Sequence, residues 1–246
     1  DNKTKLKMAT LVVFAVNSGG VSLITGDVTT LMIFLAGHVS MSQLLTLLVP
    51  AVAGVIVLAI LLSRGLSGRI TLEPVEGTFQ RADLAIAAVF FTTIVSTMLL
   101  NILFSVPPVL SFLTGLSVMF LVGISSRSEK EETKILEYIR HIEYETLLFF
   151  LGVLLLVGML KEIGVLETLT HLYVQLSPSV ANYSSGVMSS LLDNVPLTAA
   201  LLKANPELTS PEWLGLTYAV GVGGSLLAIG SAAGILAMSK VKGLTF

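Results

Sequence analysis

The fold is decided by a stretch that occurs twice in this chain. Its first copy is Ala15-Val16-Asn17-Ser18-Gly19-Gly20, then five residues, then Gly26-Asp27. Its second copy is Ala219-Val220-Gly221-Val222-Gly223-Gly224, then five residues, then Gly230-Ser231. Glycine lets a helix break, and inside a membrane a broken helix is tolerated only where it lines a cavity or is buried in protein. We therefore expect two broken transmembrane helices, although paired glycines also serve as plain helix-packing surfaces.

The composition around these stretches is that of a membrane protein. Hydrophobic residues make up 54% of the 246-residue chain and charged residues only 12%, against about 25% charged residues in soluble domains. A soluble core of this size cannot hide so much apolar surface, whereas a bilayer solvates it. The net charge of -2 does not suggest a nucleic-acid partner, and we expect none; the absence of cysteine means no disulfides and no thiolate metal site. The expected fold class is all-α and polytopic, with the lipid bilayer as partner.

Apolar segments long enough to cross a bilayer, about 17–25 residues, divide one membrane domain at 1–246. Full crossings are expected at 6–37, 42–62, 83–104, 106–124, 146–160 and 211–238. Residues 1–62 would end the first repeat and 82–124 would form two spans. Residues 63–81 would be a cytoplasmic loop, and 125–143 a charged cytoplasmic loop with a short solvated helix. Residues 144–246 would hold a span, a hairpin and the second broken helix.

The weaker apolar stretch at 179–202 is interrupted by Asp193-Asn194-Val195-Pro196. If it enters the membrane and returns on the same side, twelve Lys and Arg lie on one face and two on the other. If it crosses, the division is eleven to three. The positive-inside rule thus favours a re-entrant hairpin and places the basic face in the cytoplasm. The two glycine stretches then run in opposite directions, which is an inverted-topology repeat, a common plan of secondary transporters.

Asp27 and Asp193 are the acids within apolar segments, where a charge costs roughly 2.5–3.5 kcal/mol. Carboxylate, hydroxyl, amide and carbonyl oxygens suit a small hard cation such as sodium. The candidate ion-binding and coupling residues are Asp193, Asn194, Asp27, Asn17, Ser18, Thr29, Thr30, Ser190, Thr198, Ser225 and Ser231. The candidate helix-break residues are Gly19, Gly20, Gly26, Gly223, Gly224, Gly230 and Pro196.

These motifs, with Glu145-Thr146-Leu147-Leu148-Phe149-Phe150, resemble the NhaD family of sodium/proton antiporters. The resemblance implies a multi-pass protein of the bacterial inner membrane that exchanges sodium or lithium for protons without a cofactor, often as a homodimer. It also implies a first hairpin before Asp1 and a last crossing after Phe246, so we expect the chain to be a fragment.

Two other functions stay open at this point, an anion carrier and an assembly subunit. The resemblance also implies membership of the ion transporter superfamily, which includes anion carriers for dicarboxylates or arsenite. An anion carrier of this kind would prefer free helix amino ends and no acids at its site. A non-transporting assembly subunit would show no ion-dependent change in stability. An enzyme is not expected, because the sequence holds no nucleophile–base constellation or metal motif.

Overall fold

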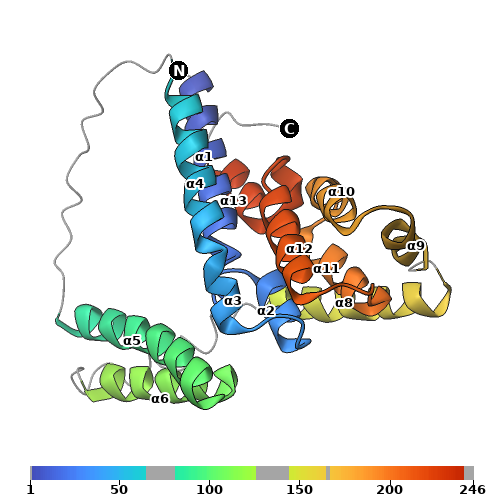
Figure 1. Ribbon diagram of the computed structural model, residues 1–246. Coiled ribbons are helices and arrows are strands. Elements are labelled where there is room, and N and C mark those ends of the chain that lie inside the picture. Colours follow the sequence, from blue (N-terminus) through green and yellow to red (C-terminus); the bar gives the residue numbers. More distant parts are fainter. Residues whose placement is uncertain (1, 65–80, 126–143, 165–166, 241–246) are drawn as a thin grey trace. The chain divides into compact units, whose positions relative to one another are not determined.

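The computed structural model describes residues 2–64, 81–125, 144–164 and 167–240, and within them the all-α prediction is confirmed. The chain divides into two compact units, residues 1–67 with 149–246 and residues 68–148. The helices, shown in Figure 1, are α1 (Asn2–Gly20), α2 (Val28–Leu35), α3 (Met41–Thr46), α4 (Leu48–Ser63), α5 (Arg81–Phe104), α6 (Pro108–Ser125), α8 (Tyr144–Glu162), α9 (Glu167–Gln175), α10 (Pro178–Leu191), α11 (Asn194–Ala204), α12 (Ser210–Gly223) and α13 (Ala232–Lys240). A short 3₁₀ helix spans Ala228–Gly230. Apart from their edges, the predicted loops at 63–81 and 125–143 lie outside the described residues.

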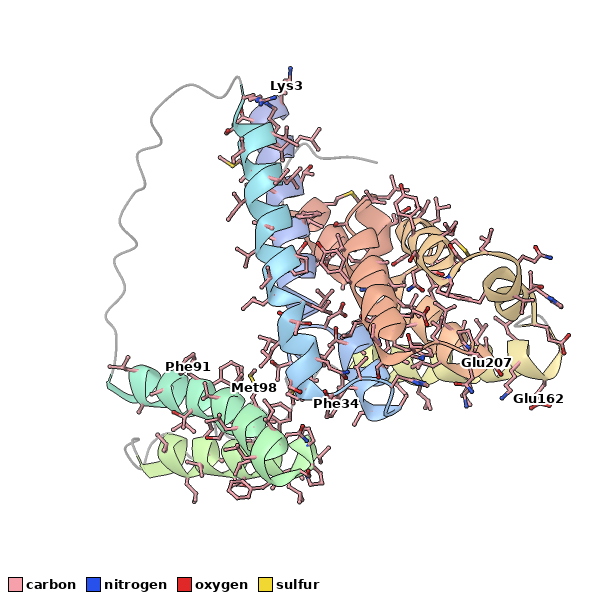
Figure 2. The ribbon with its side chains drawn as sticks, in the orientation of Figure 1. Lys3, Phe34, Phe91, Met98, Glu162 and Glu207 are labelled. Atoms are coloured by element: carbon pink, nitrogen blue, oxygen red, sulfur yellow. The ribbon has the colours of Figure 1, made fainter. Side chains whose placement is uncertain are left out.

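Two helical segments of the described part are long and apolar enough to cross a membrane, Met41–Ser63 and Leu84–Phe104. The apolar helix Pro108–Val122 is shorter. Large apolar side chains on these helices face outward: Val49 is 74% exposed and Phe91, labelled in Figure 2, is 68% exposed. Surfaces of this kind are what a lipid environment requires of a spanning helix.

Many of the side chains buried in the first unit are polar, whereas the interior of a soluble protein is mostly apolar. On α10 the buried face consists of Ala181, Asn182, Ser185, Gly186, Ser189 and Ser190, while the apolar Tyr183 and Leu191 of the same helix are exposed. Polar side chains inside and apolar side chains outside are expected where the solvent is lipid.

The second unit contains the antiparallel pair α5 and α6, which lie side by side in Figure 1. Thr93 and Thr97 are buried and donate to carbonyl oxygens of their own helix, so their hydroxyl groups are satisfied locally. A Cβ atom at Gly115 would overlap the side chain of Thr93. Small residues at this crossing therefore let the two helices approach closely, as in other membrane helix pairs.

The helical path of the expected first crossing is interrupted between α1 and α2. Helix α1 ends at Gly20 and α2 begins at Val28, with turns between them. A Cβ atom on Gly20 would lie 2.8 Å from the carbonyl oxygen of Gly26. Only glycine permits this approach, which folds the connecting turns back onto the end of α1.

The last expected crossing is interrupted in a matching way, and so is the 179–202 stretch. Helix α12 ends at Gly223, and a Cβ atom on Gly224 would lie 2.6 Å from the carbonyl oxygen of Gly230. Helix α10 ends at Leu191 and α11 begins at Asn194. Pro196 lies in the first turn of α11, where its missing N–H leaves no helical hydrogen bond unmade.

Candidate functional site

Asp27 caps the amino end of α2 and lies beside the interruption that follows α1. Its Oδ1 accepts from the backbone N–H of Thr29 at 3.1 Å, and its Oδ2 accepts from the Thr29 hydroxyl at 2.8 Å. A carboxylate at a helix N-terminus also benefits from the helix dipole. No Lys or Arg of the described residues pairs with Asp27, so hydrogen bonds and a helix end, rather than a cation of the protein, support this acid.

The amino end of α11 reaches Asp27 from a part of the chain more than 160 residues away. Asn194 Nδ2 lies 3.5 Å from Asp27 Oδ2, at the outer limit of a hydrogen bond. The neighbouring Asp193 caps α11, and its Oδ1 accepts from the N–H of Val195 at 3.4 Å. Asp193 directly precedes Asn194, the residue that contacts Asp27. Two acids and one amide thus gather where α2 and α11 begin.

The second interruption is joined to the first by a buried hydrogen bond. Asn17 Nδ2 on α1 donates to the Ser231 hydroxyl at 2.9 Å. Ser231 precedes α13, and its hydroxyl also accepts from the N–H of Gly234 at 3.3 Å. Both side chains are buried, at 8% and 2% exposure, so breaking this bond would leave a polar group unsatisfied away from water.

The remaining candidates fall into two groups. Ser190 and Ser225 donate to carbonyl oxygens within their own turns, and Thr30 donates to the carbonyl of Val21 at 3.2 Å. Ser18 and Thr198 are 0% and 2% exposed, and neither hydroxyl has a hydrogen-bond partner in the described structure. Thr198 lies one turn after Asn194 on α11, on the same helix face. Buried hydroxyls without a partner are the groups most open to an additional ligand.

Carbonyl groups at the two interruptions differ in how they are used. The carbonyls of Gly20, Val220 and Gly223 accept hydrogen bonds. The carbonyls of Gly26 and Gly230 receive no hydrogen bond from the residues that the structure describes. These two positions are equivalent in the repeated pattern, and their oxygens remain available as hard donors.

Sequence reasoning missed a polar network that holds α10 in place. Tyr173 on α9 donates to Asn182 Oδ1 at 3.0 Å, and Asn182 Nδ2 donates to the carbonyl of Glu212 at 2.8 Å. Farther along α10, the Ser189 hydroxyl donates to the carbonyl of Val220 at 2.8 Å. The signal was the helical spacing of Asn182, Ser185 and Ser189, three polar residues on one face of an otherwise apolar segment.

The donor set gathered here suits a light alkali cation and gives no support for a transition-metal centre. Within the described residues there is no group of three or more His, Cys, Asp or Glu that could hold such a metal. The oxygens that do gather are carboxylate, hydroxyl, amide and carbonyl, the ligands of hard cations.

Comparison with known proteins agrees with the resemblance seen in the sequence. Residues 1–221 match the CitMHS family model, described as a citrate transporter. The NhaD sodium/proton antiporter of Vibrio cholerae is 35% identical over 94% of this chain, and that of Vibrio parahaemolyticus is 31% identical over 99%. Sodium/proton antiporter 2 of Arabidopsis thaliana is 31% identical over 96% of the chain.

The chain spans 54% of the Vibrio cholerae protein and 66% of the Vibrio parahaemolyticus protein, between about half and two thirds of the length of these relatives. No solved structure matches it. The relatives are transporters rather than enzymes, which confirms the prediction that this is not an enzyme. With its family model matched over residues 1–221, the chain belongs to the CitMHS family of transporters and is a homologue of the NhaD sodium/proton antiporters.

Proposed function

We propose that the full-length protein is a sodium/proton antiporter of the bacterial inner membrane and that Asp27 and Asp193 couple the two ions. The observation that carries the proposal is the contact of Asp27 with Asn194, two polar groups from distant helix ends, which have no basic partner among the described residues. An intramembrane acid with no cation of its own is a functional group by default. The printed function of the NhaD relatives supports sodium and protons as the ions exchanged.

The inverted repeat belongs to this proposal, and reciprocal contacts support it. Asn17 of the first copy contacts Ser231 of the second. In the repeated pattern Gly221 corresponds to Asn17, and Asp27 corresponds to Ser231. Gly221 and Asp27 also lie close together, since a Cβ atom on Gly221 would lie 3.3 Å from Asp27 Oδ2. Such exchange of partners is what a two-fold relation between the copies produces. In transporters with inverted repeats, substrate sites lie where the repeats meet.

The proposed mechanism is competition between sodium and protons for the same carboxylates. A carboxyl group removed from water favours its neutral, protonated form until a cation arrives. Sodium binding to Asp27 and Asp193 expels the proton, so the site carries one ion or the other. The other ligands would be Asn194, Thr29 and the free carbonyls of the two interruptions. Movement of the hairpin α10–α11 with the broken helices would expose the site to each side in turn.

The family description as a citrate transporter keeps an anion substrate as the second candidate. An anion site of this kind uses the positive amino ends of half-helices. Here the amino ends of α2 and α11 are each capped by an acid of the protein itself, Asp27 and Asp193. A citrate carboxylate entering there would meet two carboxylates, so this arrangement favours a cation. Lithium is expected as an alternative cargo because it binds the same oxygen ligands.

The test is transport by the full-length gene product in sealed vesicles with a pH-sensitive dye inside. A sodium pulse should move protons in the opposite direction, and empty vesicles give the control. Labelled citrate uptake is measured in parallel on the same preparation. Citrate uptake without sodium-driven proton movement would refute the antiport proposal and select the anion carrier instead. Activity with neither substrate would leave the assembly-subunit interpretation.

A further inference from the structure

Beside Asp27 Oδ2, the side chain of Val21 fills a hollow that Gly221 leaves open. A Cβ atom added to Gly221 would overlap Cγ1 of Val21 and would lie 3.3 Å from Asp27 Oδ2. Cγ1 of Val21 therefore occupies the space where a side chain at position 221 would begin, in the neighbourhood of the carboxylate. Val21 has 0% exposure, so this methyl group is fixed among protein atoms and is not a surface contact.

The other sides of the same oxygen are polar. The Thr29 hydroxyl donates to Asp27 Oδ2 at 2.8 Å, and Asn194 Nδ2 lies 3.5 Å from it. Val21 is itself held in place, because its carbonyl accepts from the Thr30 hydroxyl. The carboxylate thus has two hydrogen-bonding neighbours, and the apolar side chain of Val21 lies near it at the backbone of Gly221.

We propose that Val21, seated in the hollow of Gly221, sets the largest cation that Asp27 can bind and so determines cation selectivity. The inference rests on the proposed antiport function and adds a residue that limits size. Discrimination between hard cations of one charge depends on cavity size, ligand number and the rigidity of the ligands. A buried methyl group cannot rotate out of the way of a larger ion, because protein interiors are close-packed.

The experiment substitutes Val21 in both directions in the full-length protein and measures proton movement driven by lithium, sodium and potassium. Val21→Ala removes two methyl groups and should raise the potassium-to-sodium activity ratio on the order of tenfold, the scale of one-methylene discrimination. Val21→Ile adds a methylene group and should raise the lithium-to-sodium ratio. Gly158→Ala on α8 is the control, because its added methyl group would meet nothing within 4 Å and Gly158 is not part of the candidate site.

A double variant returns carbon to the same space from the opposite helix. In Val21→Ala/Gly221→Ala the new methyl group at position 221 would lie 3.3 Å from Asp27 Oδ2. It would lie 3.6 Å from the Cβ atom that remains at position 21, so the two would not overlap. It should bring the potassium-to-sodium ratio back toward the wild-type value. Because the readout is a ratio, a general loss of folded protein lowers the proton movement driven by each of the three cations by the same factor and leaves the ratio unchanged. If Val21→Ala does not accumulate, the lithium-to-sodium ratio of Val21→Ile still tests the inference.

Two results are distinguished. If wild-type vesicles exchange sodium for protons and every Val21 variant keeps the wild-type cation ratios, the selectivity inference is wrong and the antiport proposal stands. If wild-type vesicles show no cation-driven proton movement, the antiport proposal itself fails and the inference fails with it.

Discussion

The close approach of Gly20 to Gly26 predicts a large difference between alanine substitutions at two adjacent glycines. In Gly20→Ala the new Cβ atom would lie 2.8 Å from the carbonyl oxygen and 3.1 Å from the carbonyl carbon of Gly26. Both are backbone atoms, so no side chain can rotate away to relieve the overlap. In Gly19→Ala the Cβ atom would meet nothing within 4 Å.

The size of the difference follows from what the two substitutions share. Both glycines lie in the last turn of α1, so both gain the helix propensity of alanine, roughly 1 kcal/mol, and this gain cancels. The remainder is the overlap at Gly20, which for added carbon in a packed site costs about 1–3 kcal/mol. At about 2–4 °C per kcal/mol, Gly20→Ala should unfold about 2–12 °C below Gly19→Ala.

The assay is thermal unfolding of the purified full-length protein in one detergent, with the two variants side by side. Gly224→Ala should resemble Gly20→Ala, because its Cβ atom would lie 2.6 Å from the carbonyl oxygen of Gly230. Equal unfolding temperatures for Gly19→Ala and Gly20→Ala would refute the reasoning. Such a result would mean that the chain after α1 does not fold back as described.

Two further predictions concern polar contacts between distant segments. Asn17→Ala and Ser231→Ala should each lower the free energy of unfolding by about 1–3 kcal/mol. A double-mutant cycle should give a coupling free energy of about 0.5–3 kcal/mol between the two residues. Additive effects would show that the hydrogen bond of 2.9 Å from Asn17 Nδ2 to the Ser231 hydroxyl is not made. Outside the expected crossings, burial beside Trp213 lowers the pKa of His38, so the unfolded chain binds that proton more tightly. The contribution of His38 to the free energy of unfolding should be complete above about pH 6.5 and should decrease as the pH falls below that value. His38→Phe keeps a stacked ring, so its unfolding temperature should depend less on pH than that of the wild type. An unchanged pH dependence of the unfolding temperature would contradict this.

The sequence predicted what depends on local chemistry. Glycine spacing predicted two broken helices, and the helix ends that fall in those stretches are Gly20 for α1 and Gly223 for α12; that these are breaks within single crossings stays a prediction. Proline and polar residues predicted the interruption near Asp193, where α10 gives way to α11. These are properties of a few adjacent residues, since backbone freedom and helix capping act over one or two turns.

The sequence did not predict which candidates meet, because pairing depends on tertiary packing. Ser190 and Asn194 looked alike as polar neighbours of Asp193, yet Ser190 donates to its own helix and Asn194 reaches Asp27. Ser and Thr within helices often bond backward to the preceding turn, and only the fold reveals which ones do not. The role proposed for Val21, an apolar residue, had no signal in composition or spacing.

The most direct test of the central claim is sodium-driven proton movement in vesicles that contain the full-length protein with Asp193→Asn or Asp27→Asn. Asparagine preserves shape and can still cap a helix, but it can neither carry the charge nor release the proton. The account predicts that Asp193→Asn abolishes the exchange and that Asp27→Asn cuts it severely, while both variants reach the membrane folded. If both variants exchanged sodium for protons at the wild-type rate, the carboxylate-competition mechanism would be contradicted.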